Sequence, residues 1–241
     1  TLQQANAFDN LIVLGTVQDG GYPHTGCSED CCREAWKDSN QKRLIASLAV
    51  LDGKDCFLVD ITPDFKYQLQ LIEHHINEKP RISGICITHA HLGHYMGLLE
   101  LGLEVMNTND IPVYVMPKMK SFLENNAPFT QLLELNNIRL LALQDNYPID
   151  IFKDVKITPF QVPHRNEYSE TVGYRIQSSH HSVIYIPDID SWDRWDTDIN
   201  QLIKESDIAL LDGTFYDKTE LKNRDVSAIP HPSIRESINF F

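Results

Sequence analysis

Three histidines stand close together where an apolar run ends, in the segment Ile87 to Tyr95. His89 and His91 are two residues apart, so in an extended chain their side chains project to the same side. His94 follows at the start of an expected helix, from which its ring can turn back toward the other two. Neutral imidazoles that converge in this way suit zinc, and also iron or manganese. The alternative is a surface histidine cluster at the junction of a strand and a helix.

Short runs rich in Val and Ile recur along the chain and are bounded by turn residues, a pattern typical of buried strands. The expected strands are Leu11–Leu14, Ile45–Leu51, Cys56–Ile61, Ile82–Thr88, Ile111–Met116, Ile138–Leu143, Val155–Val162, Thr171–Gln177, Ser182–Ile186 and Ile208–Leu211. Pro112 has no amide hydrogen, so we expect its strand at the edge of a sheet.

Amphipathic helices are expected between these strands. The clearest carries one apolar face, formed by Phe65, Leu69, Ile72 and Ile76. A second is expected directly after the histidines, with apolar positions at Leu99, Leu103 and Met106. No Gly-rich phosphate-binding loop follows a strand, and no repeat or linker divides the chain. The sequence therefore predicts one mixed α/β domain over residues 11–241.

The two ends of the chain suggest processing or truncation. Residues 1–10 are polar and begin with Thr1 rather than Met, so we expect a disordered or processed segment there. A helix that opens near Pro232 has no stop signal before residue 241, so we expect the domain to be incomplete at its C-terminus. We favour the cytoplasm, with export after cleavage of a signal as the alternative.

The charge balance excludes one class of partner. The chain has 34 acidic and 21 basic residues, a net charge of −13, and no Lys/Arg-rich run. Binding to a phosphate backbone relies on clustered cations, so we expect a small molecule or peptide as substrate and no nucleic acid. No apolar run reaches the roughly 20 residues needed to cross a bilayer. The sequence gives no indication of the oligomeric state.

Two further strand ends offer residues of the kind that bind metals. His164 follows the strand expected to end at Val162, and Asp188 follows the strand expected to end at Ile186. Strand ends are where open sheets present their sites. Each residue alone is an equally good polar strand end, so their assignment depends on the histidine segment.

The segment Thr88 to His94 resembles the His-x-His-x-Asp-His signature of the metallo-β-lactamase-fold superfamily, with His164 and Asp188 in the expected order. The resemblance implies a four-layer αββα sandwich of two mixed sheets. It implies that His89, His91 and His164 bind a first metal. His94 and Asp188 would bind a second, with Asp188 bridging the two ions. Asp60 resembles the buried carboxylate that supports the histidine loop.

Several stretches are also similar to the group that contains pyrroloquinoline quinone biosynthesis protein B. They are Gln18 to Gly21 with the following cysteines, Pro187 to Asp190, Leu211 to Phe215 and Ile229 to Pro232.

Two departures from the superfamily pattern concern the second metal. Gly93 stands where the superfamily has Asp, and no neighbour in the sequence obviously replaces that carboxylate. A C-terminal histidine on a final strand is also absent, which we attribute to truncation. We therefore expect the second site to be weaker or empty.

His231 lies in a Pro-His-Pro-Ser turn, and in phosphodiesterase-like relatives a histidine at a similar place acts as general acid. Asp212 is a candidate partner, because a carboxylate that orients an imidazole is a common acid–base arrangement. The alternative is a histidine in an ordinary loop.

Five cysteines are present, and three of them crowd into one short segment. Cys56 and Cys86 sit in apolar runs, where cysteine behaves as a small hydrophobe. Cys27, Cys31 and Cys32 resemble the thiolate cluster that holds a structural zinc in some superfamily members. A fourth ligand would come from His24 or from a C-terminal residue, and reduced thiols without metal are the alternative.

The leading hypothesis is a metal-dependent hydrolase that uses metal-activated water on an ester, phosphodiester or lactam-like substrate. Asp188, with His231 and Asp212, would take part in catalysis. Its metal would be one or two Zn²⁺ ions, with Fe²⁺ or Mn²⁺ as alternatives. A rival hypothesis, implied by the narrower resemblance, is an iron-dependent oxidative enzyme. A third is a metal-binding protein without catalytic activity.

Overall fold

The computed structural model describes residues 10–217, 219–220 and 229–241. Contacts divide the chain into two compact units. The first, called here the N-terminal unit, ends at Leu143, and the second, the C-terminal unit, begins at Gln144. The segment expected to be processed or disordered lies outside the described residues, apart from Asn10. Each unit contains one mixed sheet, so the expected α/β class with two mixed sheets is confirmed.

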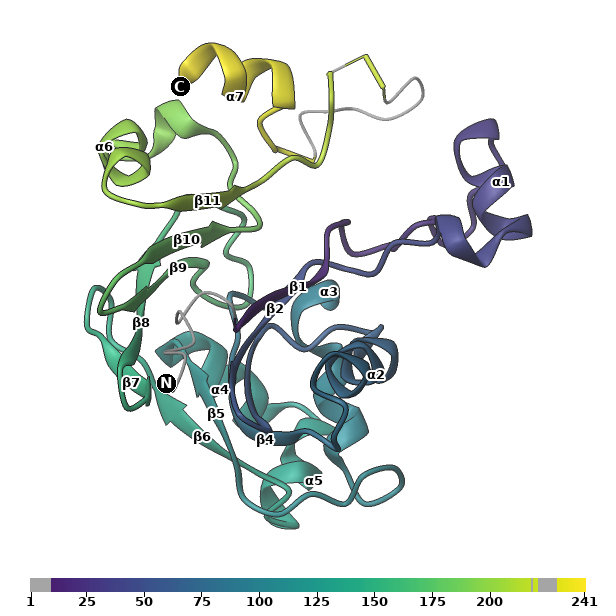
Figure 1. Cartoon of the computed structure of the whole chain (residues 1–241), viewed down its shortest axis with the longest axis vertical. Helices are drawn as coiled ribbons and strands as arrows, with labels where there is room; N and C mark the ends of the chain where they lie inside the picture. Colours follow the sequence, from purple (N-terminus) through teal and green to yellow (C-terminus); the bar gives the residue numbers. More distant parts are fainter. Residues whose placement is uncertain (1–9, 218, 221–228) are drawn as a thin grey trace, which may run out of the picture. The chain divides into compact units, whose positions relative to one another are not determined.

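The sheet of the N-terminal unit has six strands in the order of the sequence (Figure 1). They are β1 (Leu11–Gly15), β2 (Ser47–Asp52), β3 (Asp55–Val59), β4 (Arg81–Cys86), β5 (Ile111–Val115) and β6 (Ile138–Ala142). The first two pairings are antiparallel, and the pairings from β3 to β6 are parallel. Parallel strands end at the same edge of a sheet, so the segments that follow β3, β4 and β5 leave from one edge.

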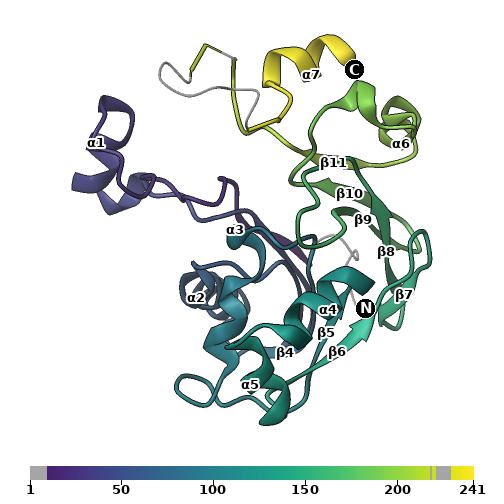
Figure 2. The same cartoon turned by 180° about the vertical axis from the view of Figure 1, so that it is seen from behind.

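Most helices of this unit contribute to one apolar core with alternate residues of the sheet, among them Leu58, Ile85 and Val113, whereas α1 and η1 lie outside it. The helices are α1 (Asp30–Lys37), α2 (Phe65–Ile76), α3 (Leu92–Tyr95), α4 (Pro117–Asn125) and α5 (Phe129–Glu134), with short 3₁₀ turns η1 (Ser39–Gln41) and η2 (Met96–Leu101). Phe65 and Ile72 of α2 are buried in that core, as the expected apolar face requires. Figure 2 shows α4 and α5 in front of β5 and β6.

Residues 16–46 form an arm that projects from the sheet of this unit and carries α1 (Figure 1). Its two sides are joined by isolated bridges between Val17 and Ile45 and between Tyr22 and Arg43. The arm also contains the three clustered cysteines.

The expectation that Pro112 places β5 at an edge is wrong, because β5 lies between β4 and β6. The pairing of β5 with β4 covers only Val113 and Tyr114. Pro112 therefore lies just outside that register, where its missing amide removes no hydrogen bond between the two strands.

The helix expected after the histidines is also partly wrong. Helical structure begins at Leu92 as α3, continues as the 3₁₀ turn η2 and ends at Leu101. The next residue, Gly102, has an extended backbone, which stops the helix, and Leu103 and Met106 are exposed. Glycine disfavours continuation because it has more backbone freedom to lose than other residues.

The C-terminal unit has a five-stranded sheet in the order β11-β10-β9-β8-β7. Its strands are β7 (Ile149–Phe152), β8 (Val155–Gln161), β9 (Val172–Ser178), β10 (Ser182–Ile186) and β11 (Ile208–Leu211). Its helices are the turn η3 (Trp192–Arg194), α6 (Ile199–Lys204) and α7 (Ile234–Phe240). Within this sheet β10 and β11 pair in parallel, so these two strands end side by side, and the other pairings are antiparallel.

The ten expected strands are all present, with ends shifted by at most two residues. The strand that the sequence did not predict is β7, which has four residues and is too short to show a clear period. The expected core positions of Cys56 and Cys86 are confirmed, because both side chains are fully buried. Among the residues that the structure describes, no helix combines the length and apolar character needed to cross a membrane.

Candidate metal and acid–base site

Two parallel strands of the N-terminal unit bring Asp60 beside the histidine segment. Val59 of β3 pairs with Cys86 of β4, so the residues after both strands emerge next to each other. The Asp60 amide donates to the Cys86 carbonyl at 2.8 Å. Asp60 has φ +65°, a left-handed conformation that aspartate tolerates better than most residues. This turn directs its carboxylate toward Thr88.

The Asp60 carboxylate accepts three kinds of hydrogen bond. The Thr88 amide donates to Oδ1 at 2.8 Å, and the Thr88 hydroxyl lies 3.0 Å from both oxygens. His94 Nδ1 lies 2.7 Å from Oδ2 and must be the donor, because an ionised carboxylate only accepts. Burial raises the pKa of Asp60, and the charge and hydrogen bond of His94 oppose that shift. The arrangement fixes the His94 ring with its Nε2 lone pair pointing away from Asp60.

His89 and His91 direct nitrogens toward each other. The Thr88 hydroxyl donates a hydrogen bond to Asp60, so its oxygen accepts a hydrogen bond from His89 Nδ1 at 2.9 Å. That leaves a lone pair on His89 Nε2, which lies 2.9 Å from His91 Nδ1. The His94 ring packs against His89 with ring centroids 4.2 Å apart. His89 and His94 are buried, and His91 is partly exposed.

A glycine allows the chain after the histidines to pack on the turn after β3. The Ile61 amide donates to the His94 carbonyl at 2.9 Å, and the Gly97 amide donates to the Ile61 carbonyl at 3.0 Å. A Cβ on Gly97 would overlap the Thr62 carbonyl oxygen. The close approach therefore requires glycine, and it holds the C-terminal end of the histidine segment.

The C-terminal unit holds His164 through a carboxylate that the sequence reading did not single out. His164 Nδ1 lies 2.9 Å from Asp190 Oδ1, and the His164 side chain is fully buried. The Asp190 amide donates to the Pro163 carbonyl at 2.7 Å, which fixes the two segments together. Because Nδ1 donates to Asp190, Nε2 of His164 carries the lone pair.

Asp188 and Asp212 follow two parallel strands whose last residues, Ile186 and Leu211, are in register. The Ile189 amide donates to Asp212 Oδ2 at 3.1 Å. Asp188 is 2% exposed and Asp212 is 4% exposed, so both carboxylates are held away from water. The ligand-type atoms of Asp188, His164 and His231 lie within 4.8 Å of one another.

The expected pairing partner of His231 is in place. His231 Nδ1 lies 2.6 Å from Asp212 Oδ2 and 3.6 Å from Asp188 Oδ1. Thr214 donates its hydroxyl to Asp212 Oδ1 at 2.6 Å and so holds the carboxylate in position. Burial lowers the pKa of His231, but the hydrogen bond and charge of Asp212, with the charge of Asp188, raise it above its ordinary value. A cleft of about 430 Å³ borders His231.

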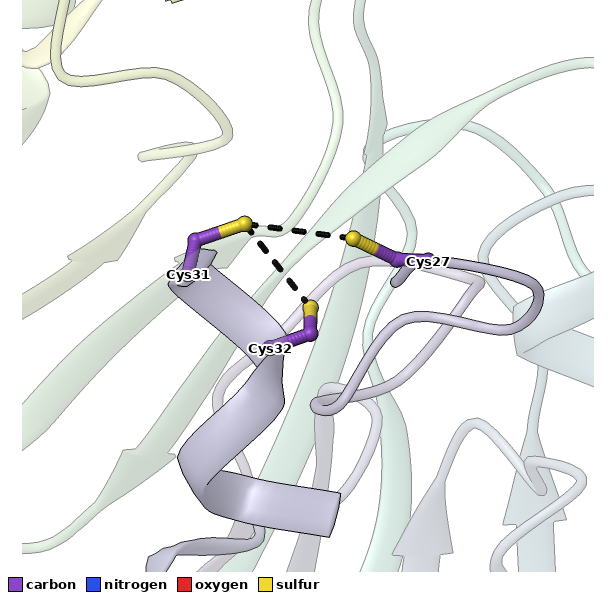
Figure 3. Close-up of side chains that lie close together, drawn as sticks. All are labelled: Cys27, Cys31 and Cys32. Carbon is purple, nitrogen blue, oxygen red and sulfur yellow. Dashed lines mark hydrogen bonds between the residues drawn. The ribbon is translucent and has the colours of Figure 1, made fainter. Parts of the chain in front are cut away.

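The three clustered cysteines lie on the arm, with their sulfur atoms facing one another (Figure 3). Cys31 Sγ is 3.9 Å from Cys27 Sγ and 4.0 Å from Cys32 Sγ. Zn–S bonds of about 2.3 Å at a tetrahedral angle place sulfur atoms about 3.8 Å apart. A hydrogen bond from the Glu29 backbone lowers the pKa of Cys27, whereas the hydrogen bond with Cys27 raises the pKa of Cys31 to about 11.

His24 does not direct its ring into the cysteine cluster. Its amide donates to Cys32 Sγ at 3.3 Å, and its ring Nδ1 donates to the Thr25 carbonyl at 2.9 Å. The described residues that gather there as candidate ligands are the three cysteines alone.

The structure identifies one further residue near the histidines. Asp19 Oδ1 lies 3.5 Å from His94 Nε2. Asp19 also lines a cleft of about 760 Å³ in the N-terminal unit, with Leu92, Arg43 and Tyr67 among the other lining residues. The sequence carried a signal in the Gln18 to Gly21 stretch, but no spacing rule connects that stretch to position 94.

Comparison with protein families gives a match to the beta-lactamase superfamily domain over residues 56–241. Among curated proteins, Coenzyme PQQ synthesis protein B of Xanthomonas campestris pv. campestris (strain B100) is 25% identical over 239 residues, which covers 90% of this chain and 77% of that protein. The protein of the same name from Rhodopseudomonas palustris (strain BisB5) is 29% identical over 131 residues, 52% of this chain and 41% of that protein.

Solved structures share the fold. Zn²⁺-bound PqqB from Methylobacterium extorquens has a TM-score of 0.77 at 22% identity, covering 93% of this chain and 80% of that one. A diphosphatase from the PhnP family has a TM-score of 0.65 at 22% identity, covering 96% of this chain and 80% of that one. These similarities confirm the metallo-β-lactamase fold and the resemblance to PqqB-like proteins.

The Asp60 carboxylate can be tested by Asp60→Asn, which keeps the left-handed backbone because asparagine tolerates it. The amide nitrogen would face hydrogen-bond donors, so we expect the free energy of unfolding to fall by about 2 kcal/mol. Urea denaturation measures the change. Asp55→Asn is the matched control, since it breaks only the exposed ion pair with Arg81 and should cost less than about 1 kcal/mol. Equal losses in the two variants would contradict a special role for Asp60.

Proposed function

This chain belongs to the beta-lactamase superfamily, and on that premise we propose that it is a metal-dependent hydrolase built as a single domain over residues 11–241. The observation that carries the proposal is the buried pair of His231 and Asp212, which forms a positioned proton donor. A structural histidine in a loop has no need of a buried carboxylate 2.6 Å from one ring nitrogen while the ring borders a cleft.

We propose His89, His91 and His164 as ligands of a first metal, following the superfamily motif. His94 and Asp188 would bind a second, and Asp188 would bridge the two ions. The donor chemistry fits, because His89 and His164 each have Nδ1 engaged by an oxygen, which leaves Nε2 to coordinate. Zn²⁺ suits these donors, and Fe²⁺ or Mn²⁺ suits them as well.

A metal held there would lower the pKa of its bound water toward 7 and so supply hydroxide as a nucleophile. The residues of the chain perform the remaining tasks. Asp212 accepts a hydrogen bond from Nδ1–H of His231 and stabilises the protonated ring, and Thr214 holds Asp212 in turn. The protonated His231 then delivers its Nε2 proton to the leaving group and becomes neutral. The raised pKa of His231 supports this role as an acid near neutral pH.

The substrate class follows from this chemistry. A nucleophilic water and a proton donor suit an ester, a phosphodiester or a lactam. A PhnP-family diphosphatase has this fold, which supports testing phosphorus-containing substrates first, phosphodiesters among them. The substrate is then a small molecule or a peptide, in keeping with the net charge of −13.

The metal assignment is tested by counting metal ions per chain in the purified protein. We expect a His89→Ala/His91→Ala variant to lose the active-site metal, because two imidazole ligands disappear. Elemental analysis by mass spectrometry measures the change. His75→Ala, on the exposed side of α2, is the control and should leave the count unchanged. A double variant with the same metal content as the unmodified chain would exclude the proposed site.

The role of His231 is tested by His231→Ala. We expect kcat to fall by about 10²–10⁴-fold with the first metal retained, because the variant removes a proton donor and no ligand of that metal. Steady-state assays with aryl phosphodiesters and elemental analysis give the two measurements. If the metal is lost together with activity, His231 is a ligand and the acid role is wrong.

An iron-dependent oxidative enzyme is the alternative function, because the curated relatives are named Coenzyme PQQ synthesis protein B. The same histidines and carboxylate suit Fe²⁺. An oxygen electrode separates the two, with the chain loaded with Fe²⁺ and given tyrosine-containing peptides. The hydrolase proposal predicts no substrate-dependent oxygen uptake. A non-catalytic metal-binding protein would show neither hydrolysis nor oxygen uptake while still retaining metal.

We further propose a structural zinc at Cys27, Cys31 and Cys32. Its support is the spacing of the three sulfur atoms, which is close to that of a tetrahedral zinc site. A zinc would fasten the tip of the arm, where α1 buries two of its residues, Cys32 and Ala35. This metal should persist in the His89→Ala/His91→Ala variant and be lost in Cys27→Ser/Cys31→Ser.

A further inference from the structure

The space beside Gly93 is filled by Asp19. A Cβ built on Gly93 would overlap Asp19 Oδ1 and would lie 2.9 Å from both Cα and Cγ of Asp19. Real Cβ atoms do not approach heavy atoms that closely. A side chain at position 93 and the observed position of Asp19 therefore exclude each other, and the Asp19 carboxylate occupies the space of the missing side chain.

The arm holds Asp19 in this place through its own backbone contacts. The Ala46 amide donates to the Val17 carbonyl at 2.8 Å, and the Gly21 amide donates to the Gln18 carbonyl at 2.8 Å. The first bond joins the two sides of the arm just before β2 begins, and the second closes a tight turn that contains Asp19. The Asp19 side chain is 39% exposed, and it reaches the 760 Å³ cleft as well as His94.

The atoms that Asp19 and His94 direct toward each other are both electron-pair donors. His94 Nδ1–H donates a hydrogen bond to Asp60, so in the neutral form of the ring, which is the form that binds metals, Nε2 carries the lone pair. Asp19 Oδ1, which also carries lone pairs, lies 3.5 Å from that nitrogen. A cation between them would turn this repulsion into attraction.

The separation of these atoms suits coordination to one metal. Two metal–ligand bonds of about 2.1 Å, at an angle near tetrahedral, place their donor atoms about 3.4 Å apart. The observed distance of 3.5 Å matches that value. A direct hydrogen bond between the same atoms would be shorter, at about 2.7–2.9 Å for a charged pair.

We propose that Asp19 is a carboxylate ligand of the second metal, in addition to Asp188, and takes the place of a side chain at position 93. This inference rests on the proposed function, because it concerns the ion assigned to His94. The acidic ligand then comes from the arm instead of the histidine segment. The sequence predicts a weaker or empty second site because of Gly93 and the absent C-terminal histidine. With Asp19 as a ligand, the carboxylate missing at position 93 is supplied from another part of the chain.

The test is a titration of the full chain with Co²⁺ after removal of bound metal by a chelator. Visible absorption and calorimetry report the number and affinity of the sites without any activity assay. We expect Asp19→Asn to lower the affinity for the second Co²⁺ ion by at least 10-fold and to leave the affinity for the first unchanged. The reason is that an amide oxygen is a poorer ligand than a carboxylate. Asp52→Asn, an exposed change at the end of β2, is the matched control.

A second variant separates coordination from a merely structural role. Asp19→Gly/Gly93→Asp moves the carboxylate to position 93 and removes the overlap, so we expect it to restore the second equivalent. The inference is overturned if Asp19→Asn binds both equivalents normally, or if the exchange restores nothing. If His89→Ala/His91→Ala loses the first Co²⁺ equivalent while the titration of Asp19→Asn is the same as that of the unmodified chain, this inference is refuted and the proposed function stands. An unchanged titration in His89→Ala/His91→Ala would refute the proposed function itself.

Discussion

The chemistry of the N-terminal unit depends on a buried carboxylate at the junction of two parallel strands. Asp60 follows β3, and Thr88 follows β4, so the strand register brings them together. The hydrogen bonds from Thr88 and His94 satisfy the carboxylate, and burying it would otherwise cost several kcal/mol. The same bonds fix the orientation of His94 and, through the Thr88 hydroxyl, that of His89. One charge thereby decides which nitrogen of each ring faces outward.

The C-terminal unit uses the same physical device. Asp212 follows β11, beside the end of its parallel neighbour β10, and it holds His231 as Asp60 holds His94. Asp190 performs the corresponding task for His164. In each case an oxygen acceptor engages Nδ1, which leaves Nε2 available for a metal or a proton. Strand ends provide rigid positions for such pairs, because the sheet fixes the backbone on which both partners stand.

In the proposed second site, the space beside Gly93 is filled by a carboxylate from the arm. Coordination requires an oxygen atom at a given position, and the side chain that supplies it can belong to either of two chain segments. Because the two side chains compete for one space, glycine at position 93 is a requirement of the observed packing. A linear motif records only residues that are neighbours along the chain, so a ligand supplied by the arm is invisible to it.

The sequence by itself determined the class of fold, the ten strands it predicted and the residues around which the candidate site is built. Hydrophobic periodicity indicates which face of a strand or helix is buried. A run such as Ile82–Thr88 that is followed by histidines indicates a strand end that carries candidate metal ligands. It did not determine that β5 is interior, because the position of a strand in a sheet depends on pairing partners far along the chain. The tertiary structure alone decided the partners of the site residues. Asp190 beside His164, Thr88 between Asp60 and His89, and Asp19 beside Gly93 are contacts that strand register and close backbone packing create, and no local pattern encodes them.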